Sequence, residues 1–187
     1  METLDKRALI IIDMWDKYQD GHTRFQNITE QTVNRLSGLI KRWYGPVVLA
    51  CYSTFLDKNN PDEWGKPEGS EVFPWKSPNL MLQHSVKDHI NSGRNGLISW
   101  DTKEVLSFLD KWDTTDAFFA GASYPGCVND RELGARSQAM AKFNNKIIID
   151  CVINYLSIGY NDYEIIHDAY RYAIKHDLDS LVTSDNL

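Results

Sequence analysis

The sequence predicts a single α/β domain in which helices cover both faces of a five- or six-stranded, mostly parallel sheet, a three-layer α/β/α sandwich. Short runs of aliphatic residues alternate along the chain with segments that repeat apolar residues at helical spacing. The aliphatic runs are continuous, which is typical of strands that are covered on both faces. A length of 187 residues fits one domain with a sizeable core, so we expect one domain over residues 1–187.

The first part of the chain predicts a strand, a helix and a second strand. Residues 7–12 are almost entirely aliphatic and predict a buried strand, and the polar and aromatic residues 15–26 predict a loop after it. Asn27 and Glu30 have the spacing of a capping box, which predicts the start of a helix. A second aliphatic strand is expected at residues 47–52. A strand, a helix and a strand in succession form a βαβ unit, which favours a parallel pair. The apolar side of the expected helix consists of Val33, Leu36, Ile40 and Trp43.

The middle of the chain has a different composition. Residues 57–79 are rich in Asn, Pro, Gly, Lys and Glu, and the aromatic residues among them favour an ordered lid or insert loop over the site. Residues 80–86 predict a short third strand, with Lys87 at its carboxyl end. A lysine is usually a solvated surface charge, so only this position gives Lys87 a functional interpretation.

The second half continues the alternation of helices and strands. Asp101 and Glu104 repeat the capping-box spacing and predict a helix. The apolar side of this helix consists of Val105, Phe108, Leu109 and Trp112. The further elements that we expect are a strand at residues 117–120, a helix from 127 to about 143 that Asn144 and Asn145 end, a strand at 146–150, a helix at 164–176 and a strand at 180–183.

Cys127 is the strongest candidate for chemistry. It follows Gly121 and a Tyr-Pro-Gly turn at the junction between an expected strand and an expected helix. The unpaired N–H groups at the start of a helix favour an anion, and a thiolate is the reactive form of cysteine. The alternative is that Cys127 is a small buried hydrophobic residue, as many cysteines are. Its position favours the functional interpretation.

Asp13 and Lys87 are the candidates for partners of the thiol. Asp13 ends the first expected strand, and all three residues are expected at the carboxyl ends of parallel strands, where open α/β sheets bind their ligands. A buried carboxylate could take the proton of the thiol, and a nearby lysine could steady the charges. Considered alone, Asp13 is more simply a turn-forming or capping residue. The convergence of the three residues favours a site.

Composition excludes several classes of partner and cofactor. The net charge of −6 and the lack of a basic run argue against nucleic acid, and no segment approaches the roughly 18 apolar residues of a membrane span. The first residues lack the apolar core of a secretory signal, and three cysteines without metal-type spacing favour a reduced, cytoplasmic setting. We therefore expect a small-molecule substrate, no cofactor, no metal, no nucleic acid and no membrane.

The chain resembles the isochorismatase-like cysteine hydrolases, which include nicotinamidases and N-carbamoylsarcosine amidohydrolases and have a Rossmann-like fold. Residues 8–14, Ala-Leu-Ile-Ile-Ile-Asp-Met, are similar to the opening strand of the family with its catalytic Asp. Gly121 and Cys127-Val128 are similar to the nucleophile turn, and residues 181–187 to the closing strand and turn. The resemblance covers nearly the whole chain and implies a homo-oligomer, a dimer or a tetramer.

The resemblance also implies roles for individual residues. The catalytic Asp, Lys and Cys of the family correspond to Asp13, Lys87 and Cys127, although the surroundings of Lys87 match poorly. A non-proline cis bond would lie between Ala122 and Ser123, and the amides of Ser123 and Cys127 would donate to the oxyanion. The candidates for further substrate contacts are Trp15, Tyr18, Tyr124 and Arg131, with a surface ion pair as the alternative for Arg131.

Departures from the family narrow the expected activity. The run after the second strand, residues 52–58, lacks the histidine of the nicotinamidase metal motif, which argues against a metal-assisted nicotinamidase. Tyr124-Pro125 stands where many relatives have a small hydroxyl residue, and Asn129-Asp-Arg131 stands where they have small apolar residues. We expect hydrolysis of a small amide-type C–N bond through a thioester on Cys127. The alternatives are a metal-free hydrolase of an isochorismate-type vinyl ether and a non-catalytic ligand-binding or assembly protein.

Overall fold

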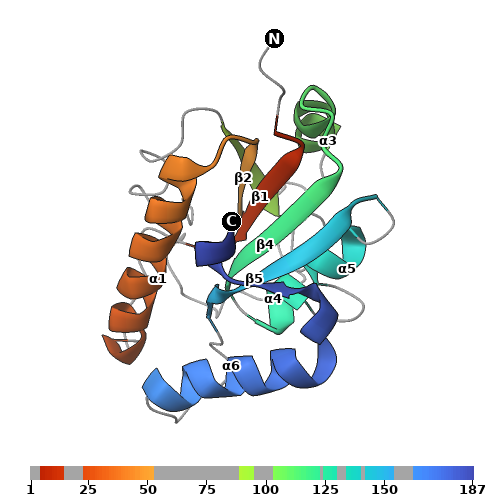
Figure 1. Cartoon of the computed structure of the whole chain (residues 1–187). Coiled ribbons are helices and arrows are strands. Elements are labelled where there is room, and N and C mark those ends of the chain that lie inside the picture. The colour runs from red at the N-terminus through yellow and green to blue at the C-terminus, as the bar shows by residue number, and fades with distance from the viewer. Residues whose placement is uncertain are drawn as a thin grey trace, which may run out of the picture.

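The computed structural model describes most of the sheet and the helices that cover it (Figure 1). The described residues are 5–14, 23–52, 89–94, 103–122, 124–129, 134–139, 142–153 and 162–187, with the backbone alone for residues 23–29, 51–52, 89–94, 138 and 162–168. The expected lid at residues 57–79 and the expected strand at residues 80–86 lie outside this part of the chain.

A parallel sheet in the order β3-β2-β1-β4-β5-β6 forms the middle layer. Every described strand pair is parallel. The strands are β1 (Arg7–Ile12), β2 (Val47–Tyr52), β3 (His89–Arg94), β4 (Asp116–Ala122), β5 (Asn144–Ile153) and β6 (Leu181–Val182). This architecture confirms the predicted three-layer α/β sandwich.

Helices cover both faces of the sheet because its central strands are apolar on both sides. Along β1, Leu9 and Ile11 pack into one buried cluster, and Ile10 and Ile12 pack into another on the opposite face. The first cluster lies under α1, which supplies Val33, Leu36 and Leu39, and the second lies under α3, α4, α5 and α6. The helices are α1 (Thr23–Arg42), α3 (Lys103–Asp110), α4 (Gly126–Asn129), α5 (Ala135–Ala139) and α6 (Asp162–His176), with 3-10 turns η1 (Leu178–Ser180) and η2 (Ser184–Asn186).

Three predicted boundaries were wrong. The helix α1 begins at Thr23, so Asn27 lies inside it and does not cap it; the preceding residues have ordinary helix propensity and allow an extra turn. The single helix expected after Cys127 is two short helices, with Gly134 in neither. Asn144 begins β5 and does not end a helix, because its amide donates to the carbonyl of Thr115 and it pairs with β4.

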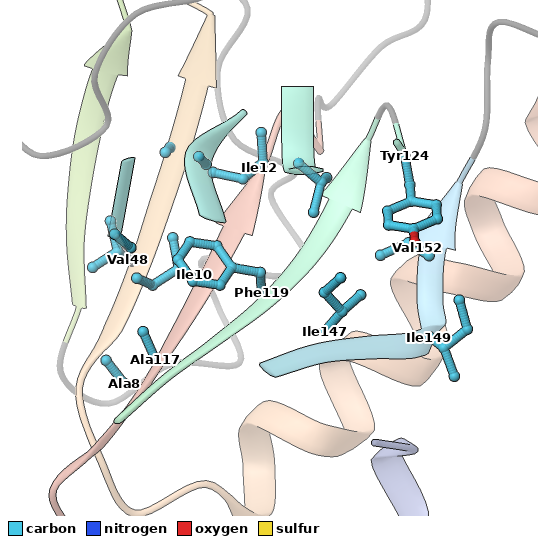
Figure 2. Close-up of a cluster of buried hydrophobic side chains, with 14 of the residues drawn as sticks. Ala8, Ile10, Ile12, Val48, Ala117, Phe119, Tyr124, Ile147, Ile149 and Val152 are labelled. Carbon is cyan, nitrogen blue, oxygen red and sulfur yellow. The ribbon is translucent and has the colours of Figure 1, made fainter. Parts of the chain in front are cut away.

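The strand order places a ligand-binding crevice at a defined point. From β1 the chain proceeds outward to β2 and β3, and from β4 it proceeds in the other direction to β5 and β6. The direction therefore reverses between β1 and β4, and in open α/β sheets ligands bind at the carboxyl ends of the strands at such a reversal. Figure 2 shows how Ile10, Ile12 and Phe119 from these two strands pack together in the core below that edge. The segments that follow β1 and β4 are the candidate site.

Candidate active site

Asp13 directly follows β1 at this edge. Its amide donates to the carbonyl of Ala50 in the neighbouring β2, at 2.8 Å, and Asp13 is buried. Its backbone has a φ of 50°, a left-handed conformation that is uncommon for a residue with a side chain. Strained residues of this kind concentrate at functional sites, where the surrounding structure holds them in place. The structure therefore fixes Asp13 at the predicted edge.

Gly121 brings the two central strands close together beside Asp13. It pairs with Ile12, and a Cβ at Gly121 would lie 2.0 Å from the carbonyl oxygen of Ile12. Its φ of 104° also favours glycine over any residue with a side chain. Only a glycine allows β4 to approach the end of β1 in this way. The sequence pattern that singled out Gly121 thus has a steric cause.

Cys127 lies in the short helix α4, which begins four residues after the end of β4. Its side chain is half-buried and packs against the core cluster that contains Ile12 and Val128. Because β1 and β4 are paired along their length, the segments that carry Asp13 and Cys127 leave the same edge of the sheet from adjacent strands. A carboxylate and a thiol at one edge can support acyl transfer, with the carboxylate as the base.

Tyr124 has a structural role in place of the predicted substrate contact. Its side chain is fully buried, packs edge-on against Tyr172 and donates a hydrogen bond from its hydroxyl to Asp177 Oδ2 at 2.8 Å. Burial and this hydrogen bond raise the pKa of Tyr124 well above its ordinary value. Its amide donates to the carbonyl of Ile153 on β5. The ring therefore belongs to the core, as Figure 2 shows.

A buried polar cluster lies behind the turn that carries Cys127, and the sequence did not reveal it. Asp177 Oδ2 accepts from both Tyr124 and Asn129, and Asp177 Oδ1 accepts from Arg136 Nη1 at 2.9 Å. Arg136 also donates to Asn129, to Asn145 and to Ser180. We call Tyr124, Asn129, Arg136 and Asp177 the Asp177 cluster. The departures from the family at Tyr124 and Asn129 were the sequence signals of it.

Other predicted site residues lie outside the described part of the chain. They are Trp15, Tyr18, Lys87, Ser123 and Arg131, together with the expected cis bond between Ala122 and Ser123. The cis bond that the described residues contain joins Tyr124 and Pro125.

The strand beside β2 lies later in the sequence than the predicted one, which changes the basic residue at its carboxyl end. The strand that pairs with β2 is β3, which begins at His89, two residues after Lys87, and ends at Arg94 opposite Tyr52. The residue at the carboxyl edge of this strand is therefore Arg94. The sequence His-Ile-Asn-Ser-Gly-Arg has little apolar character, which is why the pattern did not predict a strand there.

Cys151 differs from Cys127 in its surroundings. It lies within β5 and is fully buried, and this burial, with the nearby Asp150, raises its pKa to about 12. A thiol with such a pKa is protonated and unreactive at neutral pH. Cys151 is therefore a core residue.

The described residues hold no group of three or more metal-binding side chains, and within them no helix is long and apolar enough to cross a membrane.

The fold has many relatives among solved structures, although neither a protein-family model nor a curated protein matches the sequence. An isochorismatase-like hydrolase from Alkaliphilus metalliredigens superposes with a TM-score of 0.63 at 11% identity, over 97% of both chains. A nicotinamidase from Bacillus subtilis has a TM-score of 0.61 at 17% identity, over 96% of this chain and 99% of the other. A cysteine hydrolase from Pseudomonas syringae pv. phaseolicola has a TM-score of 0.64 at 12% identity, over 100% and 92%. The chain therefore has the α/β fold of the isochorismatase-like hydrolases and nicotinamidases.

Proposed function

We propose that this protein is a cysteine hydrolase that cleaves a small amide-type C–N bond through a thioester on Cys127. The observation that carries the proposal is that Asp13 directly follows β1 and Cys127 lies in the short helix that follows β4, two adjacent parallel strands between which the strand order reverses. The similarity in fold to an isochorismatase-like hydrolase, a nicotinamidase and a cysteine hydrolase supports the same class of reaction.

The reaction would begin with proton transfer from the Cys127 thiol to the Asp13 carboxylate. The sulfur then attacks the carbonyl carbon, and the carbonyl π electrons move to the oxygen, where backbone amides of Ser123 and Cys127 would stabilise the negative charge. As the tetrahedral intermediate collapses, the C–N bond breaks and Asp13 returns the proton to the leaving nitrogen. The products of this half are ammonia or an amine and a thioester on Cys127.

The second half would use water as the nucleophile. Asp13 takes a proton from the water molecule while the oxygen of the water attacks the thioester carbonyl. The second tetrahedral intermediate then expels the sulfur. Asp13 then returns the proton to the expelled thiolate of Cys127, which restores the enzyme, and the product is a carboxylic acid. One carboxylate therefore serves as base and acid twice in each turnover, so a change of Asp13 to an amide removes both functions.

A cationic side chain near Asp13 would stabilise its charged form. Lys87 corresponds to the catalytic lysine of the family by resemblance, whereas Arg94 occupies the carboxyl edge of β3. Single substitutions of each to methionine, compared in one assay, would assign the role. The residue that stabilises the charged form of Asp13 is the one whose substitution lowers kcat and shifts the acid limb of the pH profile of kcat.

Turnover of small substrates by the purified full chain tests the proposal. We expect release of ammonia from one or more small primary amides, and loss of this activity in Cys127→Ala and Asp13→Asn by at least about a thousandfold. Cys151→Ala is the matched control and should retain the activity. Turnover of isochorismate that survives Cys127→Ala would instead indicate the vinyl ether reaction. Binding of amides without any product would indicate a ligand-binding protein.

A further inference from the structure

The geometry points to the Asp177 cluster as the device that positions the Cys127 turn, with Asp177, Tyr124 and Asn129 acting as positioning residues for the thiol. This inference rests on the proposed function, because it concerns the nucleophile of that reaction. The sequence did not predict that any of these side chains positions Cys127, and Asp177 lies 50 positions beyond Cys127 in the sequence.

One carboxylate binds the turn on both sides of the thiol. Tyr124 is three residues before Cys127 and Asn129 is two residues after it, and both donate to the same oxygen, Asp177 Oδ2, at 2.8 Å. Two backbone hydrogen bonds add to this restraint: Tyr124 N–H donates to the Ile153 carbonyl, and Asn129 N–H donates to the Pro125 carbonyl. The segment from 124 to 129 is therefore fixed at both ends.

Asn129 is held in a closed ring of hydrogen bonds. Its Nδ2 donates to Asp177, its Oδ1 accepts from Arg136 Nη1 at 2.9 Å, and the same Arg136 atom donates to Asp177. Both ends of the side-chain amide are satisfied, so the amide cannot rotate without loss of two hydrogen bonds. The last residue of α4 is thus held in one orientation.

The cluster itself is anchored to parts of the fold that do not belong to the site. Asp177 follows α6, and its amide donates to the Ala173 carbonyl. Arg136 lies on α5 and also reaches Asn145 on β5 and Ser180 in η1. The charged side chains of Arg136 and Asp177 are 10% and 9% exposed, so water competes little for these hydrogen bonds.

The placement of a nucleophile matters because a small displacement from the geometry of attack lowers the reaction rate by a large factor. A turn that joins a strand to a four-residue helix has few interactions of its own to hold it. The Asp177 cluster supplies them through the hydrogen bonds of Tyr124 and Asn129 to Asp177. Loss of one hydrogen bond from this cluster should therefore change the behaviour of Cys127 more than it changes the stability of the fold.

Alkylation of Cys127 as a function of pH tests this inference in the full chain. The variants are Tyr124→Phe and Asn129→Ala, alone and together, because they remove hydrogen bonds to Asp177 without a change of net charge. The matched control is Ser184→Ala, which removes a hydroxyl that donates to another carboxylate, Asp150, away from this turn. The rate of reaction with iodoacetamide is followed at each cysteine by peptide mass spectrometry from pH 5 to 10.

We expect the midpoint of the Cys127 profile in the wild type to lie below the ordinary cysteine value of about 8.5, and to rise by about one pH unit towards it in the double variant. We also expect kcat on a primary amide to fall by roughly tenfold or more, with KM little changed. Ser184→Ala should leave both quantities unchanged.

The results separate this inference from the proposed function. A wild-type midpoint at the ordinary value, without amide turnover, would contradict the activated thiol itself. A low wild-type midpoint that stays unchanged in Tyr124→Phe and in the double variant would overturn the positioning role alone. Thermal unfolding of each variant shows that the measurements refer to folded protein.

Discussion

Gly121 lies so close to Ile12 that a Cβ on Gly121 would stand 2.0 Å from the carbonyl oxygen and 2.8 Å from the amide nitrogen of Ile12. Both of these atoms belong to the backbone of the central strand β1, which cannot move aside as a flexible side chain can. The contact joins the two strands whose ends carry Asp13 and lead to Cys127. The spacing of the candidate active site therefore depends on a residue that takes no part in the chemistry.

Gly121→Ala should destabilise the fold strongly. The added methyl group would collide with β1, and alanine would also have to adopt a φ of 104°, so we expect a loss of roughly 3 kcal/mol or more in the free energy of unfolding. Urea denaturation measures this loss. Gly38→Ala in α1 is the control, because nothing lies within 4 Å of the added group there, and it should stabilise the protein by about 0.5–1 kcal/mol. Equal effects of the two substitutions would contradict the close approach.

Arg136 and Asp177 should be energetically coupled. Arg136→Met leaves a buried carboxylate without its charged partner, and we expect it to cost about 3–5 kcal/mol. Asp177→Asn should also destabilise the fold, and the double variant should cost less than the sum of the two by about 1–3 kcal/mol. A double-mutant cycle of urea denaturation curves measures the coupling. Additive costs would show that the ion pair does not contribute as a unit.

Cys151 should make the fold sensitive to alkali. Its pKa is raised by burial from near 9 to about 12, so its contribution to stability is complete below pH 9 and is lost as the pH rises through 12. In this window the free energy of unfolding should fall about 1.4 kcal/mol per pH unit more steeply in the wild type than in Cys151→Ala. Tyr124, whose pKa is also raised by burial, affects both proteins equally, whereas the pKa of Tyr170 is raised mainly by burial and to a lesser extent by Asp150 and Cys151. Parallel stability curves from pH 9 to 12 would contradict this prediction.

The carboxyl-terminal turn should depend on Asp150. The Ser184 amide and hydroxyl both donate to the Asp150 carboxylate, at 2.8 Å and 2.5 Å, and Arg42 donates to the Ser184 carbonyl. Asp150→Ala leaves the buried Ser184 donors unsatisfied and should cost about 1–3 kcal/mol. Thermal or urea unfolding measures the change. The control, Asp185→Ala, alters an exposed residue of the same turn and should stay within about 0.5 kcal/mol of the wild type.

Local patterns in the sequence determined most of the sheet. The aliphatic runs at β1, β2, β4 and β5 predict strands because every residue in them can be buried whichever neighbour the strand receives. The positions of Asp13 and Cys127 in the fold could also be predicted, because Asp13 directly follows one of these runs and Cys127 closely follows another. The parallel pairing of β1 and β2 also follows from the strand-helix-strand order of this part of the sequence.

Tertiary structure decided the elements whose stability comes from distant partners. The polar strand β3 exists because its backbone pairs with β2, and Asn144 joins β5 because it pairs with β4. Tyr124 has the composition of a pocket wall, but its hydroxyl meets Asp177, 53 residues away, and this contact makes it a core residue. Hydrogen bonds across such separations leave no periodic pattern in the chain, because only the folded arrangement of α4, α5 and α6 brings their donors and acceptors together.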